Sequence, residues 1–183
     1  AFKNLRAQGV MPVVAAGNSG NASAISFPAC VSNAFTVGAA KLGGTAPASY
    51  SNFSDQVRLF AIGGDIGAAY NMPTVCTNVN FDCWSGGAGT SPAAAMVSGA
   101  VAVLRASKPE ASLADIEAAL QTSDKTLAVG NVQKPLLNIA QAGAQLLGVA
   151  VTTPTPAPAP APTPTPTPTP VALSNYTRMC IYS

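Results

Sequence analysis

The sequence predicts an α/β protein with a mainly parallel sheet, followed by an extended segment rich in proline and threonine. Three short apolar runs occupy the first third of the chain, at 10–16, 34–40 and 57–63. Runs of this kind are typical of strands that are buried on both faces. Helical patterns follow at 91–107, 112–120 and 136–147. Strands beside packed helices favour a layered α/β architecture.

The first element is the end of a helix. The opening residues AFKNLRAQG read as the last turns of a helix that Gly9 stops. Pro12 has no N–H to donate to a ladder, so we expect the first strand to begin at Val13. Because the chain opens inside a helix and does not start with Met, we expect it to be a fragment or a processed piece.

The later helices carry recognisable start signals. Pro92 stands in the first turn of the helix over 91–107, where its missing N–H costs nothing. Ser112 is an N-cap for the next helix, with Asp115 three residues later. The last helix is predicted from about Leu136 to Leu147, after Pro135.

The composition changes abruptly after the last helix. The stretch 152–170 alternates proline with threonine or alanine and holds 9 of the 16 prolines. We expect an extended, semi-rigid spacer of polyproline type. The predicted organisation is therefore a globular part over 1–148, a Pro/Thr-rich linker over 149–170 and an unassigned tail over 171–183.

Composition excludes several classes of function. Nine basic and seven acidic residues give a net charge of +2, so nothing indicates a nucleic-acid partner. No apolar run reaches the roughly 18 residues of a transmembrane helix. The chain contains no histidine, so no imidazole-based metal site and no cofactor for catalysis are expected. A structural calcium ion is possible, but the acidic residues lack the spacing of calcium ligands and do not support it.

The four cysteines and the Pro/Thr segment favour a secreted or cell-surface setting. Cys76 and Cys83 bracket a short stretch and are candidates for a local disulfide, and the alternative is that they are free thiols. Three Asn-x-Ser/Thr triplets fit the N-glycosylation pattern, which is common by chance. They begin at Asn21, Asn52 and Asn175.

The segment GAGTSPAAAMVSGAVAVL, residues 87–104, places Ser91 at the start of an apolar helix. A hydroxyl there lies beside unpaired backbone N–H groups and the positive end of the helix dipole, which suits the stabilisation of an oxyanion. The glycines before it would let another backbone approach closely. The simpler reading is an ordinary N-cap serine.

This segment resembles the nucleophile segment of subtilisin-like serine proteases (the subtilase or peptidase S8 family), G-T-S-M-A-x-P-H-V-x-G. Pro92, Ala95 and Met96 depart from that pattern. A second block, VVAAGNSG (13–20), resembles the family segment in which a strand ends in A-A-G-N. Three further blocks follow in the family's order, and together they cover about residues 1–147. The residues that agree in the first segment are Gly89, Thr90, Ser91, Ala93, Val97 and Gly99.

The resemblance implies a partial three-layer subtilisin-like fold and a serine endopeptidase that acts on protein or peptide substrates. Ser91 would be the nucleophile, and Asn18 would donate to the oxyanion together with the N–H of Ser91. Without the resemblance, Asn18 reads as part of an Asn-Ser-Gly turn. The resemblance also implies a cis peptide bond at Phe27-Pro28. Substrate-binding positions carried over from the family are Ala15, Ala16, Gly17, Gly89 and Thr90.

The family's catalytic Asp and His belong to segments that come earlier in the chain, and neither segment is present. The resemblance therefore covers the C-terminal half of the catalytic domain, and we expect the 183 residues alone to be inactive without the N-terminal half. A C-terminal module or a cell-wall attachment could follow the linker. The departures at Pro92, Ala95 and Met96 support an alternative, a pseudoprotease or a surface-displayed structural or binding protein. A binding module on a linker is a third reading.

Overall fold

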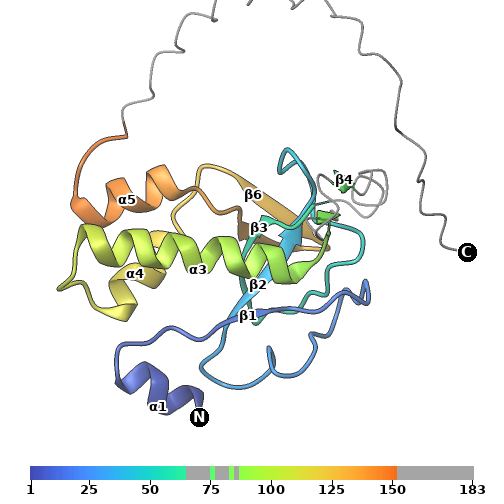
Figure 1. The fold of residues 1–183 in the computed structure, drawn as a ribbon, viewed down its shortest axis with the longest axis horizontal. Coiled ribbons are helices and arrows are strands. Elements are labelled where there is room, and N and C mark those ends of the chain that lie inside the picture. Colours follow the sequence, from blue (N-terminus) through green and yellow to red (C-terminus); the bar gives the residue numbers. More distant parts are fainter. Residues whose placement is uncertain (65–74, 77–82, 85–86, 152–183) are drawn as a thin grey trace, which may run out of the picture. The chain divides into compact units, whose positions relative to one another are not determined.

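The computed structural model describes residues 1–64, 75–76, 83–84 and 87–151 (Figure 1). The chain divides into two units, Ala1–Val151 and Thr152–Ser183. The predicted Pro/Thr-rich spacer from residue 152 onward and the tail at 171–183 lie outside the described residues. Within the described part, no helix is both long and apolar enough to cross a membrane.

Three parallel strands form the central sheet, as the sequence predicts. Strand β1 (Val13–Ala15) pairs with β2 (Phe35–Ala40), and β2 pairs with β3 (Val57–Ile62). Every residue of β2 is buried, which agrees with its unbroken run of small and apolar side chains. Because all three strands run in the same direction, the loops that follow them meet at one edge of the sheet.

Helix α3 (Thr90–Ser107) packs against all three strands, and Figure 1 shows it lying across the sheet. Helices α4 (Leu113–Leu120) and α5 (Ile139–Leu147) pack beside it. These helices and the sheet enclose the larger core, whose biggest side chains include Phe35, Leu59 and Leu104. The short helix α1 (Phe2–Ala7) buries none of its residues and ends before Gly9, which has φ +76°.

Helix α4 begins as predicted. The Ser112 hydroxyl accepts from the N–H of Asp115, and the Asp115 carboxylate accepts from the N–H of Ser112. This reciprocal pair is a capping box, which satisfies two backbone donors that the helix itself leaves unpaired.

The opposite face of the sheet is covered by a hairpin that the sequence analysis did not predict. Strands β6 (Thr126–Val129) and β7 (Val132–Pro135) pair antiparallel. Their apolar residues close a second core, in which the rings of Phe53 and Phe60 stack with centroids 5.9 Å apart. Leu127 is buried in this core.

The predicted start of the last helix is wrong by three residues. Leu136 is bridged to Phe60 of β3, and the N–H of Leu137 donates to the Phe60 carbonyl across 2.7 Å. Helix α5 then begins at Ile139, because the side chain of Asn138 accepts from the N–H of Gln141 and caps it. Because residues 136–137 bond to β3, they are not part of the helix that their apolar character favours.

The cysteines of the predicted disulfide lie in a two-stranded ribbon. Strand β4 (Val75–Cys76) pairs antiparallel with β5 (Cys83–Trp84), and the backbone of Cys76 is opposite that of Cys83. Their side chains are outside the described part of the structure, so the disulfide stays a prediction. Cys30 is an exposed free thiol.

Candidate active site

The two residues predicted to act on the substrate come from segments at the same edge of the sheet. Asn18 follows β1, and Ser91 is the second residue of α3. Glycines let α3 begin close to the end of β3. The N–H of Gly89 donates to the carbonyl of Gly63 across 2.9 Å. A Cβ on Gly63 would lie 2.4 Å from the Gly89 carbonyl oxygen, so only glycine fits there without a shift.

The carboxamide of Asn18 is oriented by Thr90. Its Oδ1 accepts from the N–H of Thr90 across 2.9 Å and from the hydroxyl of Thr90 across 2.8 Å. Because only the oxygen of an amide can accept from an N–H, these bonds assign Oδ1 and Nδ2. A Cβ on Gly89 would lie 3.1 Å from Asn18 Nδ2, so this nitrogen lies beside the residue that precedes α3. No described residue accepts from Nδ2, whose protons are available to a ligand.

The hydroxyl of Thr90 also holds the backbone of the loop. It accepts from the N–H of Gly17 across 3.1 Å while it donates to Asn18. Thr90 is 1% exposed, so its hydroxyl is shielded from solvent and bonds to protein groups. Thr90 therefore holds both the backbone of Gly17 and the side chain of Asn18, and the substrate-binding role expected for Thr90 and Gly89 stays a prediction.

Ser91, the predicted nucleophile, is exposed. Its N–H belongs to the first turn of α3 and has no acceptor among the described residues. Such N–H groups, together with the helix dipole, attract a developing negative charge. Ser91 is therefore an accessible hydroxyl at a helix terminus, next to the residue that orients the Asn18 amide.

The other predicted substrate-binding positions differ in accessibility. Ala15 and Gly17 are half-buried, whereas Ala16 is fully buried and its side chain belongs to the second core. The carbonyl of Ala16 accepts from the N–H of Ser26 across 2.9 Å, so the loop over 17–26 returns to the end of β1. The Phe27-Pro28 peptide bond is cis, as the resemblance implies.

Sequence analysis missed one polar residue at this edge. Asn52 fits the N-glycosylation pattern, but it is 3% exposed and its amide is fully hydrogen-bonded within the fold, which excludes a glycan in the native state. The signal in the sequence was that this polar residue directly precedes Phe53, an aromatic residue of a kind that is usually buried. It predicts a buried polar contact but not the partner.

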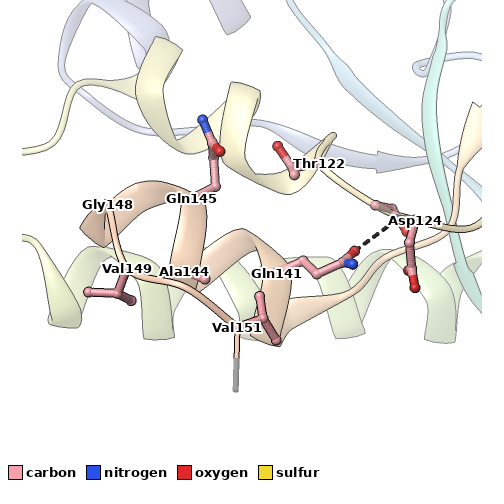
Figure 2. Close-up of a pocket in the computed structure, with 9 residues that line it drawn as sticks. Thr122, Asp124, Gln141, Ala144, Gln145, Gly148, Val149 and Val151 are labelled. Atoms are coloured by element: carbon pink, nitrogen blue, oxygen red, sulfur yellow. Dashed lines mark hydrogen bonds between the residues drawn. The ribbon is translucent and has the colours of Figure 1, made fainter. Parts of the chain in front are cut away.

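Three cavities lined by described residues lie elsewhere in the structure, and none of the three is lined by a predicted site residue. Figure 2 shows one of about 470 Å³ between the end of α4 and α5. Its walls include Thr122, Gln141 and Gln145, and the N–H of Asp124 donates to Gln141 Oε1 across 2.8 Å. In the described ranges, no three His, Cys, Asp or Glu side chains are grouped to hold a metal ion.

Comparison with protein families identifies the chain. The model of the subtilase family (Peptidase_S8) matches residues 1–141. This chain belongs to the subtilase family. The predicted fold class, a partial subtilisin-like α/β fold with a parallel sheet, is thereby confirmed for the globular part.

The subtilase chain is similar to curated proteins named Alkaline protease 1. It is 44% identical to that of Aspergillus clavatus over 78 residues, which is 43% of this chain and 19% of the relative. It is 44% identical to that of Emericella nidulans over 71 residues, which is 39% of this chain and 17% of the relative. The matched segments thus span about a fifth of the length of these relatives.

Solved subtilase-like structures superimpose on most of the chain. A protease from Pseudoalteromonas arctica has a TM-score of 0.65 and 26% identity, covering 79% of this chain and 45% of that one. The prenylagaramide maturation protease PagA has a TM-score of 0.60 and 25% identity, covering 79% and 54%. The PatG macrocyclase domain shares the fold, with a TM-score of 0.60 and 22% identity over 80% and 46%.

Proposed function

We propose that this subtilase chain supplies the nucleophile and the oxyanion-binding groups of a serine endopeptidase. The observation that carries the proposal is the double hydrogen bond from Thr90 to Asn18 Oδ1, at 2.9 and 2.8 Å. It leaves Asn18 Nδ2 as a donor beside the start of α3, where Ser91 is exposed. Family membership and the relatives named proteases support the reaction class.

In the proposed reaction, Ser91 Oγ attacks the carbonyl carbon of the scissile peptide bond and gives up its proton to a base. The Ser91 N–H and Asn18 Nδ2 donate to the oxyanion that forms. The C–N bond then breaks, the base returns the proton to the leaving amine, and an acyl-enzyme remains on Ser91. Water, activated by the same base, hydrolyses this ester and restores the serine.

The base must come from outside these 183 residues, because subtilases use a histidine and this sequence contains none. We therefore propose that the chain alone is inactive. The partner is a segment that carries the Asp and His of the triad, the N-terminal half of the same domain. No cofactor is proposed for catalysis.

Two adjoining surfaces suit such a segment. Strand β1 pairs only with β2 among the described strands, so its other backbone edge can accept a further strand. Helix α3 carries no charged residue before Arg105, and its outer face exposes apolar side chains that include Met96 at 48% and Val103 at 53%. An uncharged, apolar helix face of this length is typical of a surface that another part of the protein covers.

The proposed substrate is a protein or peptide with an apolar side chain next to the scissile bond. Ser19 and Ser26 lie near the end of β1 and are uncharged, so neither would form an ion pair with a charged substrate side chain. The proposed location is secreted or at the cell surface, which the cysteines and the Pro/Thr-rich segment support.

A complementation experiment tests the proposal. The chain is assayed with a fluorogenic peptide alone and after co-expression with the N-terminal part of the Aspergillus clavatus alkaline protease catalytic domain. We expect turnover only from the co-purified complex. Ser91→Ala should reduce kcat by about 10⁶-fold, and Asn18→Ala by about 10²- to 10³-fold with little change in KM.

Ser107→Ala is the matched control, because Ser107 is an exposed serine at the far end of the same helix whose hydroxyl donates to the Val103 carbonyl. It should leave turnover unchanged. Turnover by the chain alone would contradict the proposed inactivity. Turnover that survives Ser91→Ala, or a co-purified complex without any turnover, would contradict the assigned protease chemistry.

The alternative is a pseudoprotease or surface-displayed binding protein built on the subtilase fold. Pro92, Ala95 and Met96 favour it, since they depart from the family pattern within the nucleophile helix and all three are exposed. The same complex distinguishes the two. A pseudoprotease would bind peptide without cleaving it, and Ser91→Ala would not weaken that binding.

A further inference from the structure

The side chain of Asn52 lies beneath the loop that carries Asn18, and it uses its entire hydrogen-bonding capacity there. Its Nδ2 donates to the Ala16 carbonyl across 3.3 Å and to Ser26 Oγ across 3.0 Å. Its Oδ1 accepts from the N–H of Ser19 across 2.9 Å and from the N–H of Asn21 across 3.0 Å. Two donors and two acceptor positions are all that an asparagine side chain offers.

These contacts hold the loop on both sides of Asn18. The backbone N–H of Asn52 donates to the Gly17 carbonyl across 2.9 Å, while its side chain holds the N–H of Ser19. Gly17 has φ +104°, and a Cβ there would lie 2.4 Å from Asn52 Nδ2. Asn52 thus contacts the residues that precede and follow Asn18 and touches a turn that only glycine can form.

Asn52 and Thr90 hold different parts of the loop. Thr90 binds the side chain of Asn18, whereas Asn52 binds the backbone around it. The loop over 17–26 contains no helix or strand, so without these bonds its residues would regain conformational entropy. Donors that stabilise an oxyanion do so because they are held in place before the reaction.

We propose that Asn52 is the positioning residue of the oxyanion site: it fixes the backbone of Asn18 so that Nδ2 points at the developing charge. This inference rests on the proposed function. It requires the amide chemistry of asparagine at this position. Aspartate has the same shape, but it would place a buried negative charge against the Ala16 carbonyl and lose both donors. Serine is too short to reach both sides of the loop.

The first test does not depend on activity. Amide hydrogen exchange is measured by NMR in the 183-residue chain and in its Asn52→Ser and Asn52→Asp variants. The reporter is the N–H of Thr90, which donates to Asn18 Oδ1 and does not contact Asn52. If Asn52 positions Asn18, its loss should raise Thr90 exchange by at least about tenfold relative to the buried N–H of Leu59 in β3.

The matched control is Asn138→Ala, which removes an asparagine side-chain bond to the N–H of Gln141 and so destabilises the protein away from the site. Here Thr90 and Leu59 exchange should rise together. A ratio of Thr90 to Leu59 exchange that is the same in the Asn52 variants and in this control overturns the proposal. If neither Asn52 variant folds, Ser26→Ala removes one acceptor of Asn52 Nδ2 and should raise the same ratio by a smaller factor.

The second test uses the complemented enzyme described above. The Asn52 variants should lower kcat by about 100-fold while KM changes less than about twofold, because a displaced oxyanion donor affects the transition state more than substrate binding. Asn138→Ala should change neither constant. Full kcat in the Asn52 variants overturns the proposal. A raised Thr90 exchange without hydrolysis by any complex upholds the positioning role and rejects the protease function.

Discussion

The hydroxyl of Thr90 donates to Oδ1 of Asn18 across 2.8 Å, and the two residues are 72 positions apart in the sequence. This bond joins the start of helix α3 to the loop that follows β1. The N–H of Thr90 donates to the same oxygen, and this second bond settles that Oδ1 is the end of the Asn18 amide that faces Thr90. Thr90 is buried, whereas Asn18 is exposed.

Thr90→Val should therefore disturb Asn18, although valine and threonine are similar in size. Valine keeps the shape of threonine but removes the hydroxyl, which leaves the N–H of Gly17 without its acceptor. We expect a loss of about 1–3 kcal/mol in the free energy of unfolding, measured with urea. We also expect altered side-chain amide signals of Asn18 in ¹⁵N NMR spectra.

Thr36→Val is the matched control for this prediction. Thr36 is equally buried, at 1% exposure, and its hydroxyl donates to the Ala29 carbonyl across 2.9 Å. It should lower stability to a similar degree and leave the Asn18 amide signals unchanged. Equal changes in those signals in both variants would show that Thr90 has no particular role.

Alanine at two glycines should have opposite effects on stability. Gly63→Ala would place a Cβ 2.4 Å from the Gly89 carbonyl oxygen and 2.6 Å from Ala39 Cβ, so we expect a loss of about 1–3 kcal/mol. Gly143→Ala, within α5, meets no atom within 4 Å and should gain about 0.5–1 kcal/mol. Chemical denaturation of both variants checks the signs, and a neutral Gly63→Ala would disprove the close approach.

The capping box of α4 predicts a dependence of stability on pH. The Ser112 hydroxyl, and next its backbone N–H, hydrogen-bond to the Asp115 carboxylate and lower its pKa. Because the pKa of Asp115 is lower in the folded state than in the unfolded state, its ionised carboxylate stabilises the folded protein at pH values above the unfolded pKa of about 3.9. That stabilisation is lost as the pH falls through the folded-state pKa.

Thermal unfolding between about pH 5 and pH 2 tests this dependence. The decline of Tm with acid should be less steep in Asp115→Asn than in the wild type. Ser112→Ala should reduce the slope in the same way, since it removes the first cause of the shift. If both variants keep the wild-type slope, other carboxyl groups account for the acid sensitivity.

Helix α1 should depend on the ion pair between Arg6 and Glu117. Arg6 pairs with Glu117 of α4, which raises the pKa of the guanidinium, and the two side chains are 26% and 18% exposed. Since α1 buries no residue, Glu117→Gln should increase amide exchange in α1 and cost the whole protein about 1 kcal/mol or less. Added salt should reduce the difference between variant and wild type. A difference that is independent of salt would mean that packing holds α1.

Local patterns predicted most elements of this fold. The three strands, the beginning of the first strand at Val13, the helix over 91–107 and the capping of α4 by Ser112 agree with the structure. Each depends on neighbours within one turn of a helix or on the apolar character of one short run. The hairpin β6–β7 was missed because its strands are short, and Leu136 was misassigned because its partner Phe60 is 76 positions away.

The sequence by itself determined the family, because motifs in a fixed order can be recognised without any knowledge of contacts. It also identified Ser91 and Asn18 as the candidate site residues. Tertiary structure alone decided how the Asn18 amide is turned, that Thr90 holds it and that Asn52 lies beneath the loop. The physical reason is that a polar side chain can bond to any suitable group that folding brings near it. Sequence shows which side chains can donate or accept, and only the packing of distant segments selects the partner.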